Sequence, residues 1–318
     1  MMPRRRQQGV AVITALLLTT LAITIVASLF WQQQVQVRSM ENQRLHLQTR
    51  WVALGMADFA RFWLREDFSP ITTLNDIWAK PIEEAQLDDY IDREREQGEK
   101  FNATVSGRAT DAQARYNLTN LMNGKIPDPK QLLVFQRLLT NLQLDSGLAQ
   151  AVQKMMADTS VAGAGPDQPN VPPGEGSQSG GGGGSALIGL TQVEDLLAVP
   201  GMTPQVLDKL RDFVIVLPVR SKVNVNTAPA EVLAALGDVS LSEANTLVVA
   251  RQRTPFISAA NFTSNLGKPA SVDVDVKSDY FLASILVKLD RAVLNAQALI
   301  QRTQQPTRTT KMIWMREY

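Results

Sequence analysis

The sequence contains no cysteine and only one histidine, His46, among its 318 residues. The lack of thiols excludes cysteine nucleophiles and cysteine-based zinc sites, and one imidazole cannot build a histidine-rich metal site. The 32 basic and 31 acidic residues leave a formal net charge of +1, so no excess charge favours nucleic acid or an anionic surface as a partner. Carboxylates alone could still support catalysis, but no pair of acids stands out as general acid and base. We therefore predict that the chain is not an enzyme.

Charge is also missing from a long stretch near the N-terminus, because no ionisable residue occurs from Val10 to Trp31. A helix of this length spans roughly 33 Å, which matches a hydrocarbon core of about 30 Å. Three arginines, Arg4–Arg6, precede the stretch, and three glutamines, Gln32–Gln34, follow it. Because basic residues favour the cytoplasmic side, residues 10–31 are predicted to be a single transmembrane helix with a cytoplasmic N-terminus and an exported head.

Three processing routes fit this segment. A secretory signal peptide could be cut near Val26-Ala27-Ser28, although the apolar run is longer than the usual stretch of about 7 to 15 residues. An uncut signal anchor is the second route. The third, which we favour, is cleavage on the cytoplasmic side directly after Gly9, which would make residues 1–9 a leader and Val10 the mature N-terminus.

Helix-breaking residues are scarce from Val10 to about Asp67, which predicts one continuous helix. Beyond the membrane, its apolar residues fall at spacings of three and four, on one face: Leu45, Thr49, Val52, Met56, Phe59 and Trp63. This face is predicted to pack against a globular head, with Trp51, Phe62 and Trp78 in the same core and His46 at the surface.

The rest of the chain predicts an α+β fold in which an antiparallel sheet is interrupted by helices. Residues 32–120 are assigned to the first part of the head, with a loop at 81–99 and then a hairpin that turns between Gly107 and Asp111. Residues 121–267 are predicted to be an inserted all-α domain. Within it, residues 161–185 are rich in Gly, Pro and Ser and are expected to form a mobile loop. Residues 268–318 return to the head as three antiparallel strands.

Two stretches of the insert, 193–214 and 223–256, are similar to the halves of helix-hairpin-helix domains, which bind DNA backbone through glycine amides. The alternative function is therefore a membrane-anchored DNA-binding protein. However, the first turn, Pro200-Gly201-Met202-Thr203, lacks a second glycine, and acidic residues outnumber basic ones between Leu187 and Gly267. Since phosphate binding needs a clustered positive surface, we expect no nucleic acid partner. Asn226 or Thr227 is predicted to cap the helix that starts at Pro229.

The stretch Ser271–Asp279, just after the predicted insert, supplies carboxylates at alternating positions: Asp273, Asp275 and Asp279. Oxygen ligands of this kind could hold calcium, and we name them as candidate ligands. An exposed edge strand shows the same alternation, and Lys277 would repel a cation, so both interpretations stay open.

Four features together resemble the type II secretion minor pseudopilin K family, also called general secretion pathway protein K. They are Gly9 before the apolar helix, Asp111–Leu118 leading into the helical block, Val223-Asn224-Val225-Asn226-Thr227-Ala228-Pro229, and the run from Ser278 to Arg302. The resemblance covers nearly the full length. It departs from the family at Ala114 and Thr119, where glycine and asparagine are often found.

The resemblance implies a pilin-like fold and cleavage by a prepilin peptidase, with N-methylation of Val10. It also implies a place at the tip of an inner-membrane-anchored, periplasmic pseudopilus, together with the minor pseudopilins I and J and other pseudopilins. Family members can bind calcium in the head. Most pilin-like subunits carry glutamate at the fifth mature position, where it can neutralise the N-terminal amine of the subunit above. Here that residue is Thr14, which fits a subunit with no neighbour above it.

Overall fold

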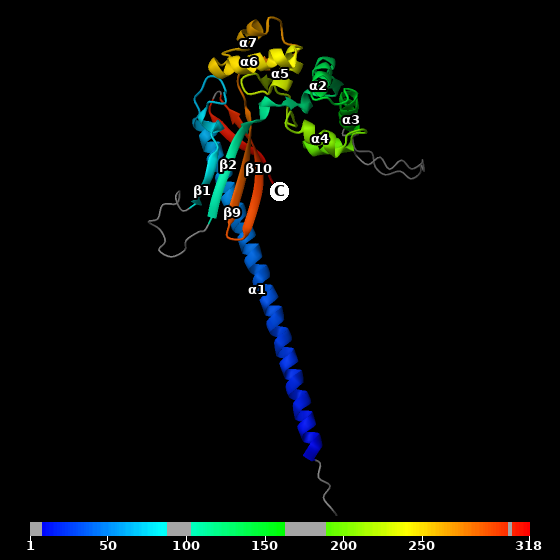
Figure 1. The fold of residues 1–318 in the computed structure, drawn as a ribbon, viewed down its shortest axis with the longest axis vertical. Coiled ribbons are helices and arrows are strands. Elements are labelled where there is room, and N and C mark those ends of the chain that lie inside the picture. Colours follow the sequence, from blue (N-terminus) through cyan, green and yellow to red (C-terminus); the bar gives the residue numbers. More distant parts are fainter. Residues whose placement is uncertain (1–7, 88–102, 163–188, 305–306) are drawn as a thin grey trace, which may run out of the picture.

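The computed structural model describes residues 8–87, 103–162, 189–304 and 307–318. Its longest element is helix α1, Gln8–Glu66, which runs unbroken for 59 residues and extends far beyond the head (Figure 1). The continuous helix expected from the sequence is thus confirmed. Within the described chain, Ala11–Glu66 is the one single helix long and apolar enough to cross a membrane.

The head is built on a five-stranded antiparallel sheet with strand order β1-β2-β9-β10-β11. Its strands are β1 Ile82–Gln86, β2 Ala103–Asp111, β9 Tyr280–Leu289, β10 Ala292–Thr303 and β11 Thr309–Glu317. The last three are the C-terminal strands predicted from their apolar alternation. Strand β2 pairs directly with β9, so the sheet brings together residues that lie far apart in the sequence.

One face of the sheet packs against the C-terminal half of α1. The helix presents two alanines at the contact, Ala53 and Ala57, both without exposed surface, and these small side chains let the backbone approach the strands closely. The larger residues of the predicted face flank them and are half-buried. Trp78 is 2% exposed, as expected.

Two aromatic residues expected in this core lie outside it. Trp51 is 72% exposed and Phe62 is 49% exposed, because both project from the side of α1 that faces away from the sheet. The hairpin expected at Gly107 is also wrong, since β2 continues straight through that residue. A Cβ at Gly107 would lie 3.7 Å from Met56 Cε, so the glycine serves close packing of the helix on the strand. Residues 82–86 of the expected loop form β1 instead.

Between β2 and β9 the chain leaves the sheet and builds a mainly helical insert. Its helices are α2 Pro129–Asn141, α3 Leu148–Ala162, α4 Pro204–Leu210, α5 Ala230–Gly237, α6 Leu241–Arg253 and α7 Ala259–Leu266. The insert also contains three short 3-10 helices: η3 Ala112–Ala114, η4 Leu118–Leu121 and η5 Val193–Ala198. Another 3-10 helix, η1 Ile77–Ala79, precedes β1. The predicted glycine-rich segment 161–185 lies almost wholly outside the described residues.

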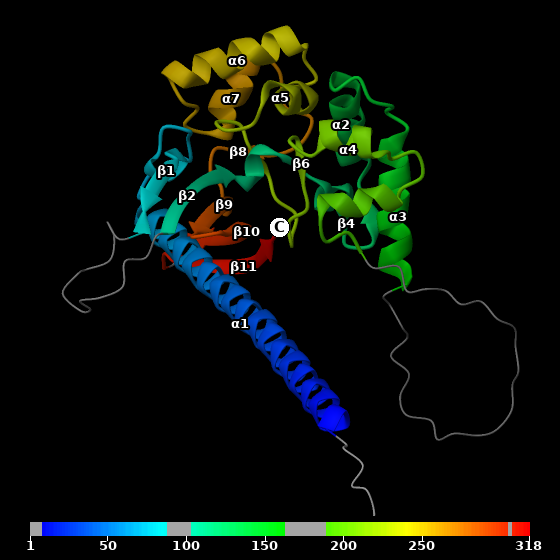
Figure 2. The same cartoon turned by 60° about the horizontal axis from the view of Figure 1, so that its bottom comes forward.

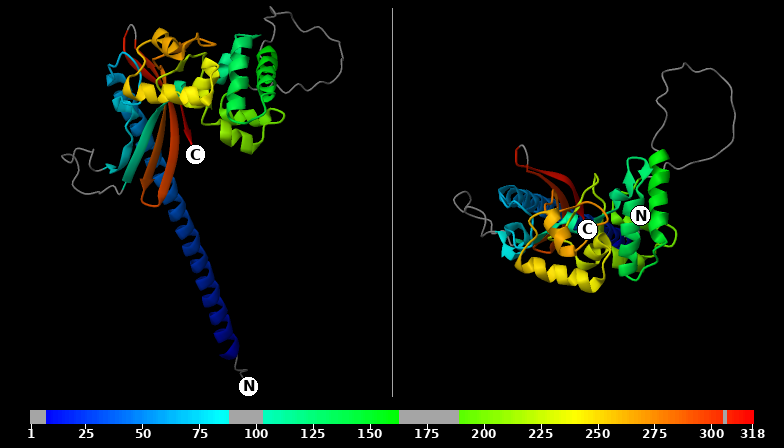
Figure 3. Two further views of the ribbon diagram at one scale, coloured as in Figure 1. Left: turned by 45° about the horizontal axis from the view of Figure 1, so that its top comes forward. Right: turned by 90° about the horizontal axis from the view of Figure 1, so that it is seen from above.

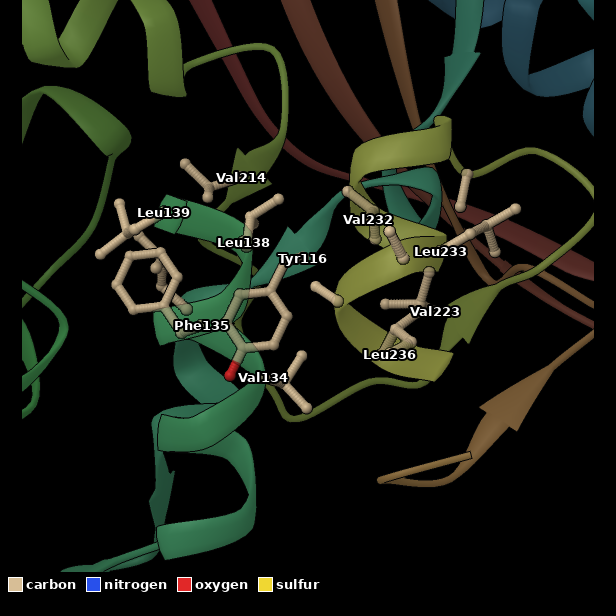
Figure 4. Packing of buried hydrophobic residues seen from close by; sticks show 14 of the residues in the cluster. Tyr116, Val134, Phe135, Leu138, Leu139, Val214, Val223, Val232, Leu233 and Leu236 are labelled. Atoms are coloured by element: carbon tan, nitrogen blue, oxygen red, sulfur yellow. The ribbon is translucent and has the colours of Figure 1, made fainter. Parts of the chain in front are cut away.

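Short strand pairs occur within the insert, and two of them connect segments that lie far apart in the sequence. Strands β3 Tyr116–Asn117 and β6 Val214–Ile215 are parallel, as are β7 Val223–Asn224 and β8 Val274–Asp275. Strands β4 Met122–Asn123 and β5 Ile126–Pro127 are antiparallel. The insert has its own core, in which the rings of Tyr116 and Phe135 stack with centroids 5.5 Å apart (Figure 4).

The insert lies at the end of the head opposite the free part of α1. Helices α5, α6 and α7 cover the far end of the sheet, whereas α2, α3 and α4 project to one side (Figures 1 and 2). Seen along α1, the insert makes the head much broader than the sheet alone (Figure 3).

Candidate functional site

A buried carboxylate lies at the point where the chain leaves the sheet for the insert. Asp111 ends β2 and is 3% exposed. Its Oδ1 accepts a hydrogen bond from the backbone N–H of Gln113 at 2.8 Å, which begins the first turn of the insert. The side chain therefore caps η3 with one oxygen and leaves the other for more distant partners.

Three side chains from later in the sequence donate to Asp111 Oδ2. They are Ser278 Oγ at 2.5 Å, Thr227 Oγ1 at 2.6 Å and Asn224 Nδ2 at 2.9 Å. Asn224 has no exposed surface, and its Nδ2 also lies 3.1 Å from the backbone oxygen of Thr72. One carboxylate thus connects the start of the insert, its middle and its return to the sheet.

A buried ion pair adjoins this carboxylate cluster. Arg302 of β10 donates from one terminal nitrogen to Asp67 Oδ2 at 2.7 Å, and from the other to Thr72 Oγ1 and the Ser278 carbonyl. The two side chains of the pair are only 3% and 5% exposed. Since Asp67 directly follows α1, the ion pair joins the end of the spine helix to the strand beside the insert. We call the residues Asp67, Thr72, Asp111, Asn224, Thr227, Ser278 and Arg302 the junction network.

Burial dominates the electrostatics of Asp111. It raises the pKa of this carboxyl above the ordinary value of 3.8, while the hydrogen bonds from Ser278, Thr227, Gln113 and Asn224 act in the opposite direction. An oxygen that accepts three donors favours the ionised form, so these hydrogen bonds limit the rise in pKa that burial causes. Because the members of the junction network are closed to solvent, the arrangement serves to fix segments in place and offers no surface for a substrate.

The sequence singled out the motifs of the junction network but did not show that their residues bind one another. Asn226 and Thr227 were expected to cap a helix, but the helix begins after Pro229 with no side-chain cap. Thr227 instead binds Asp111, and Asn226 binds the backbone N–H and carbonyl of Phe256. The sequence did hold a signal, because small polar residues occur together in an otherwise apolar stretch. The buried Asp111, which needs hydrogen-bond donors, explains why they are there.

The three aspartates proposed as calcium ligands are not assembled into a site. Asp273 lies 3.8 Å from Lys222 Nζ with a side chain that is 88% exposed, and Asp275 Oδ1 accepts from the backbone of Val276. Burial raises the pKa of Asp279, and the nearby Arg302 opposes this. In the described part of the chain, no three acidic, histidine or cysteine side chains are placed to hold a metal ion. The residues as positioned do not fit a calcium cage, and the calcium site stays an untested prediction.

The turns that resemble DNA-binding hairpins are used for packing. Gly201 has a φ of +87°, and a Cβ there would lie 3.1 Å from Leu148 Cδ2. A Cβ on Gly237 would lie 2.8 Å from Leu266 Cδ1. Both glycines thus face apolar side chains of the insert rather than open space for a phosphate. The residue after Gly237, Asp238, pairs with Arg137 at 3.1 Å.

The residues that concern processing and assembly lie in the first turns of α1. The helix already includes Gly9 and Val10, and no acidic residue occurs in its first turn. Thr14 donates its hydroxyl to the backbone carbonyl of Ala11 at 3.0 Å, which satisfies a polar group inside an apolar helix. Cleavage after Gly9, methylation of Val10 and the role of Thr14 stay predictions.

Comparisons with known proteins agree on one family. Models for type II secretion system (T2SS) protein K match residues 114–219 and 223–281, which together make up just over half of the chain. The chain is 29% identical to type II secretion system protein K of Pseudomonas aeruginosa over 301 residues, covering 87% of this chain and 84% of that protein. It is 27% identical to the Klebsiella pneumoniae protein of that name over 331 residues, covering 93% of each.

A solved structure has the same fold. The chain matches a chain from the crystal structure of the GspK-GspI-GspJ complex of enterotoxigenic Escherichia coli with a TM-score of 0.59 at 16% identity, covering 88% of this chain and 99% of that one. The predicted α+β fold, with its long N-terminal helix, antiparallel sheet and several helices, is thereby confirmed. From the matched family models, the similar full-length relatives and the shared fold, we conclude that this chain belongs to the type II secretion system protein K family.

Proposed function

We propose that this protein is the minor pseudopilin at the tip of the type II secretion pseudopilus, where it starts and caps assembly to support protein export across the outer membrane. The observation that carries the proposal is the position of the insert, at the end of the head opposite the free part of α1 (Figure 1). In a filament of parallel spine helices, each head lies below the next one. A broad insert at this end of the head fits the last position in the filament. At any other position it would obstruct the head of the next subunit.

The proposed partners are minor pseudopilins I and J, other pseudopilins below them, and the prepilin peptidase. The shared fold with a chain from a GspK-GspI-GspJ complex supports the first two. Helix α1 supports anchoring in the inner membrane by a single span, with the N-terminus cytoplasmic and the head in the periplasm. The role is structural rather than enzymatic. The alternative, DNA binding, has no support from the packed glycines of the two turns.

The absence of cysteine makes the tip position directly testable. Lys209, exposed on α4 of the insert, is changed to Cys as the single labelling site and is tagged with maleimide-gold on sheared pseudopili. The same substitution at Arg253, exposed on α6, gives a matched second label. We expect one gold particle at one end of each filament. Particles repeated along the filament would contradict the proposal.

Processing is tested separately by mass spectrometry of the N-terminus in cells with and without the prepilin peptidase. We expect a chain that begins at N-methylated Val10 only when the peptidase is present. An intact residue 9–10 bond in cells containing the enzyme would contradict cleavage after Gly9.

Calcium is tested by titration of the full chain in detergent with CaCl₂, and of a variant with Asp273→Asn and Asp275→Asn. A melting temperature that rises with calcium in the wild type but not in the variant would support these ligands. An equal response in both proteins would exclude them.

A further inference from the structure

The insert covers only part of the second face of the sheet. Along β9, alternate residues face away from α1, and the two nearest the insert, Tyr280 and Leu282, are buried against Ile215 and Leu217. The next two residues on that face, Ser284 and Leu286, are only half-buried. A cleft therefore opens between the sheet and the insert where this contact ends.

Two hollows, which we together call the sheet–insert cleft, lie on this face. The first, of about 320 Å³, lies between the two parts and is lined by Arg115 and Arg211 of the insert and Trp314 of β11. The second, of about 550 Å³, lies on the sheet beyond the insert and is lined by Arg108 and Ser284 and by no residue of the insert. Gln297 and Tyr318 line both hollows. In Figures 1 and 2 the C-terminal end of the chain lies in this region, between the sheet and the insert.

A row of polar side chains crosses the sheet at the floor of the cleft. The strand register places Arg108, Ser284, Gln297 and Arg316 side by side on four consecutive strands. Three strand spacings separate the two arginines, a distance of roughly 14 Å between their backbones. Both arginines can therefore contact one extended segment of about four or five residues.

The arginines of the cleft are incompletely neutralised. Its acidic residues are Glu194 and Asp212, against four arginines. Arg211 pairs with Asp208 at 3.2 Å, but within the described chain Arg108 and Arg115 have no carboxylate at ion-pair distance. Arg115 is half-buried; burial lowers the pKa of its guanidinium, Asp212 opposes this, and Arg108 adds to it. Positive charges held this close favour an added anion.

One arginine is also fixed in position. The Arg316 guanidinium lies 4.2 Å from the centre of the Trp314 ring and donates to the backbone carbonyl of Thr191 at 3.1 Å. A guanidinium anchored on an aromatic ring loses little freedom when it binds a carboxylate, and it retains donors for a two-point contact.

We propose that the sheet–insert cleft binds an acidic, extended polypeptide segment of another protein, with Arg115 and Arg316 as its carboxylate anchors and Ser284 and Gln297 as hydrogen-bonding partners. Four arginines spread over the floor and wall match several carboxylates along a chain better than one compact anion. This site is independent of the position of the protein in the pseudopilus.

The test uses the full chain in nonionic detergent and fluorescein-labelled, amidated hexaglutamate as the probe, followed by fluorescence anisotropy. We expect saturable binding that weakens by roughly tenfold or more in the double variant with Arg115→Gln and Arg316→Gln, since each removes a charged hydrogen bond. Arg253→Gln, which removes one exposed arginine on α6, is the control for the general loss of a positive charge, matched to the single variant Arg316→Gln, and should change the affinity by less than about twofold.

Additional measurements make the outcome of the binding experiment decisive. Because Arg115 is half-buried, Arg316→Gln is also measured alone, and it should weaken binding at an unchanged melting temperature. Labelled hexaglutamine should not bind. Equal losses in the double variant and in Arg253→Gln would overturn the proposal, as would equal binding of hexaglutamine. Displacement of the probe by inorganic phosphate at the concentration at which unlabelled hexaglutamate displaces it would assign the cleft to small anions and would also overturn the proposal.

Discussion

Among single residues, Asn224 lies at the centre of the junction network and has no exposed surface. Its Nδ2 serves Asp111, Ser278 and the Thr72 carbonyl, and its Oδ1 accepts from the backbone of Asn226. Asn224→Ala would remove one of the three donors to Asp111 Oδ2 and would take the Asn224 amide away from the Thr72 carbonyl and the Asn226 N–H, so we expect a loss of about 2 to 4 kcal/mol in the free energy of unfolding. Chemical denaturation of the full chain in detergent measures it. Asn265→Ala, on the exposed side of α7, is the control and should cost less than about 0.5 kcal/mol.

The raised pKa of Asp111 makes part of the stability depend on pH. A carboxyl whose folded-state pKa is raised contributes stability that is present below its ordinary value of 3.8 and is lost as the pH rises through the folded-state pKa. Thr227→Val removes a donor that favours the charged form. We therefore expect the destabilisation caused by Thr227→Val to grow as the pH rises above the ordinary carboxyl value of 3.8 and through the folded-state pKa. Thr246→Val, exposed on α6, should show a difference that does not change with pH; a flat profile for Thr227→Val would contradict the assignment.

Among whole elements, those with a strong local sequence pattern were predicted correctly, whereas those whose structure depends on a distant partner were not. Helix α1 and the strands β9, β10 and β11 have periodic apolar residues over eight or more positions, and they were predicted correctly. The strand β1 is short and carries two glutamates, so its pattern indicates a loop, and pairing with β2 decides its structure. Likewise, nothing local tells that Thr227 binds Asp111 rather than a helix end, because the two are 116 positions apart.

The glycine at the turn before α4 offers a test of how the hairpin-like elements are used. Gly201→Ala places a side chain at a φ of +87° and 3.1 Å from Leu148, so we expect a loss of about 1 to 3 kcal/mol in the free energy of unfolding. Gly55, exposed within α1, would meet nothing within 4 Å. Gly55→Ala should therefore stabilise the helix by up to about 1 kcal/mol. Equal effects of the two substitutions in a denaturant titration would show that packing at Leu148 does not constrain the turn.

At the scale of the whole molecule, the junction network joins the head, the insert and the membrane helix into one unit. Asp67 follows the last residue of α1, Arg302 lies on β10, and Asn224 belongs to the insert. A force along α1 therefore reaches the insert through buried ionic and hydrogen-bonded contacts rather than through a flexible connection. Such a connection is compatible with the proposed tip position, in which a growing filament would push the subunit from below.

The substitution Thr14→Glu tests the N-terminal end of α1. The threonine hydroxyl bonds to its own helix, whereas a glutamate at this depth needs an amine from a neighbouring subunit to offset the cost of a charge in lipid. In the proposed tip position, no subunit lies above to supply that amine. We expect Thr14→Glu to lower secretion of a type II substrate into the culture medium and to reduce the amount of the protein recovered with pseudopili. Thr14→Ser, which keeps the hydroxyl, should leave both unchanged. Unchanged secretion with Thr14→Glu would remove the charge argument for the tip and leave the argument from the breadth of the insert to be decided by the gold-labelling experiment.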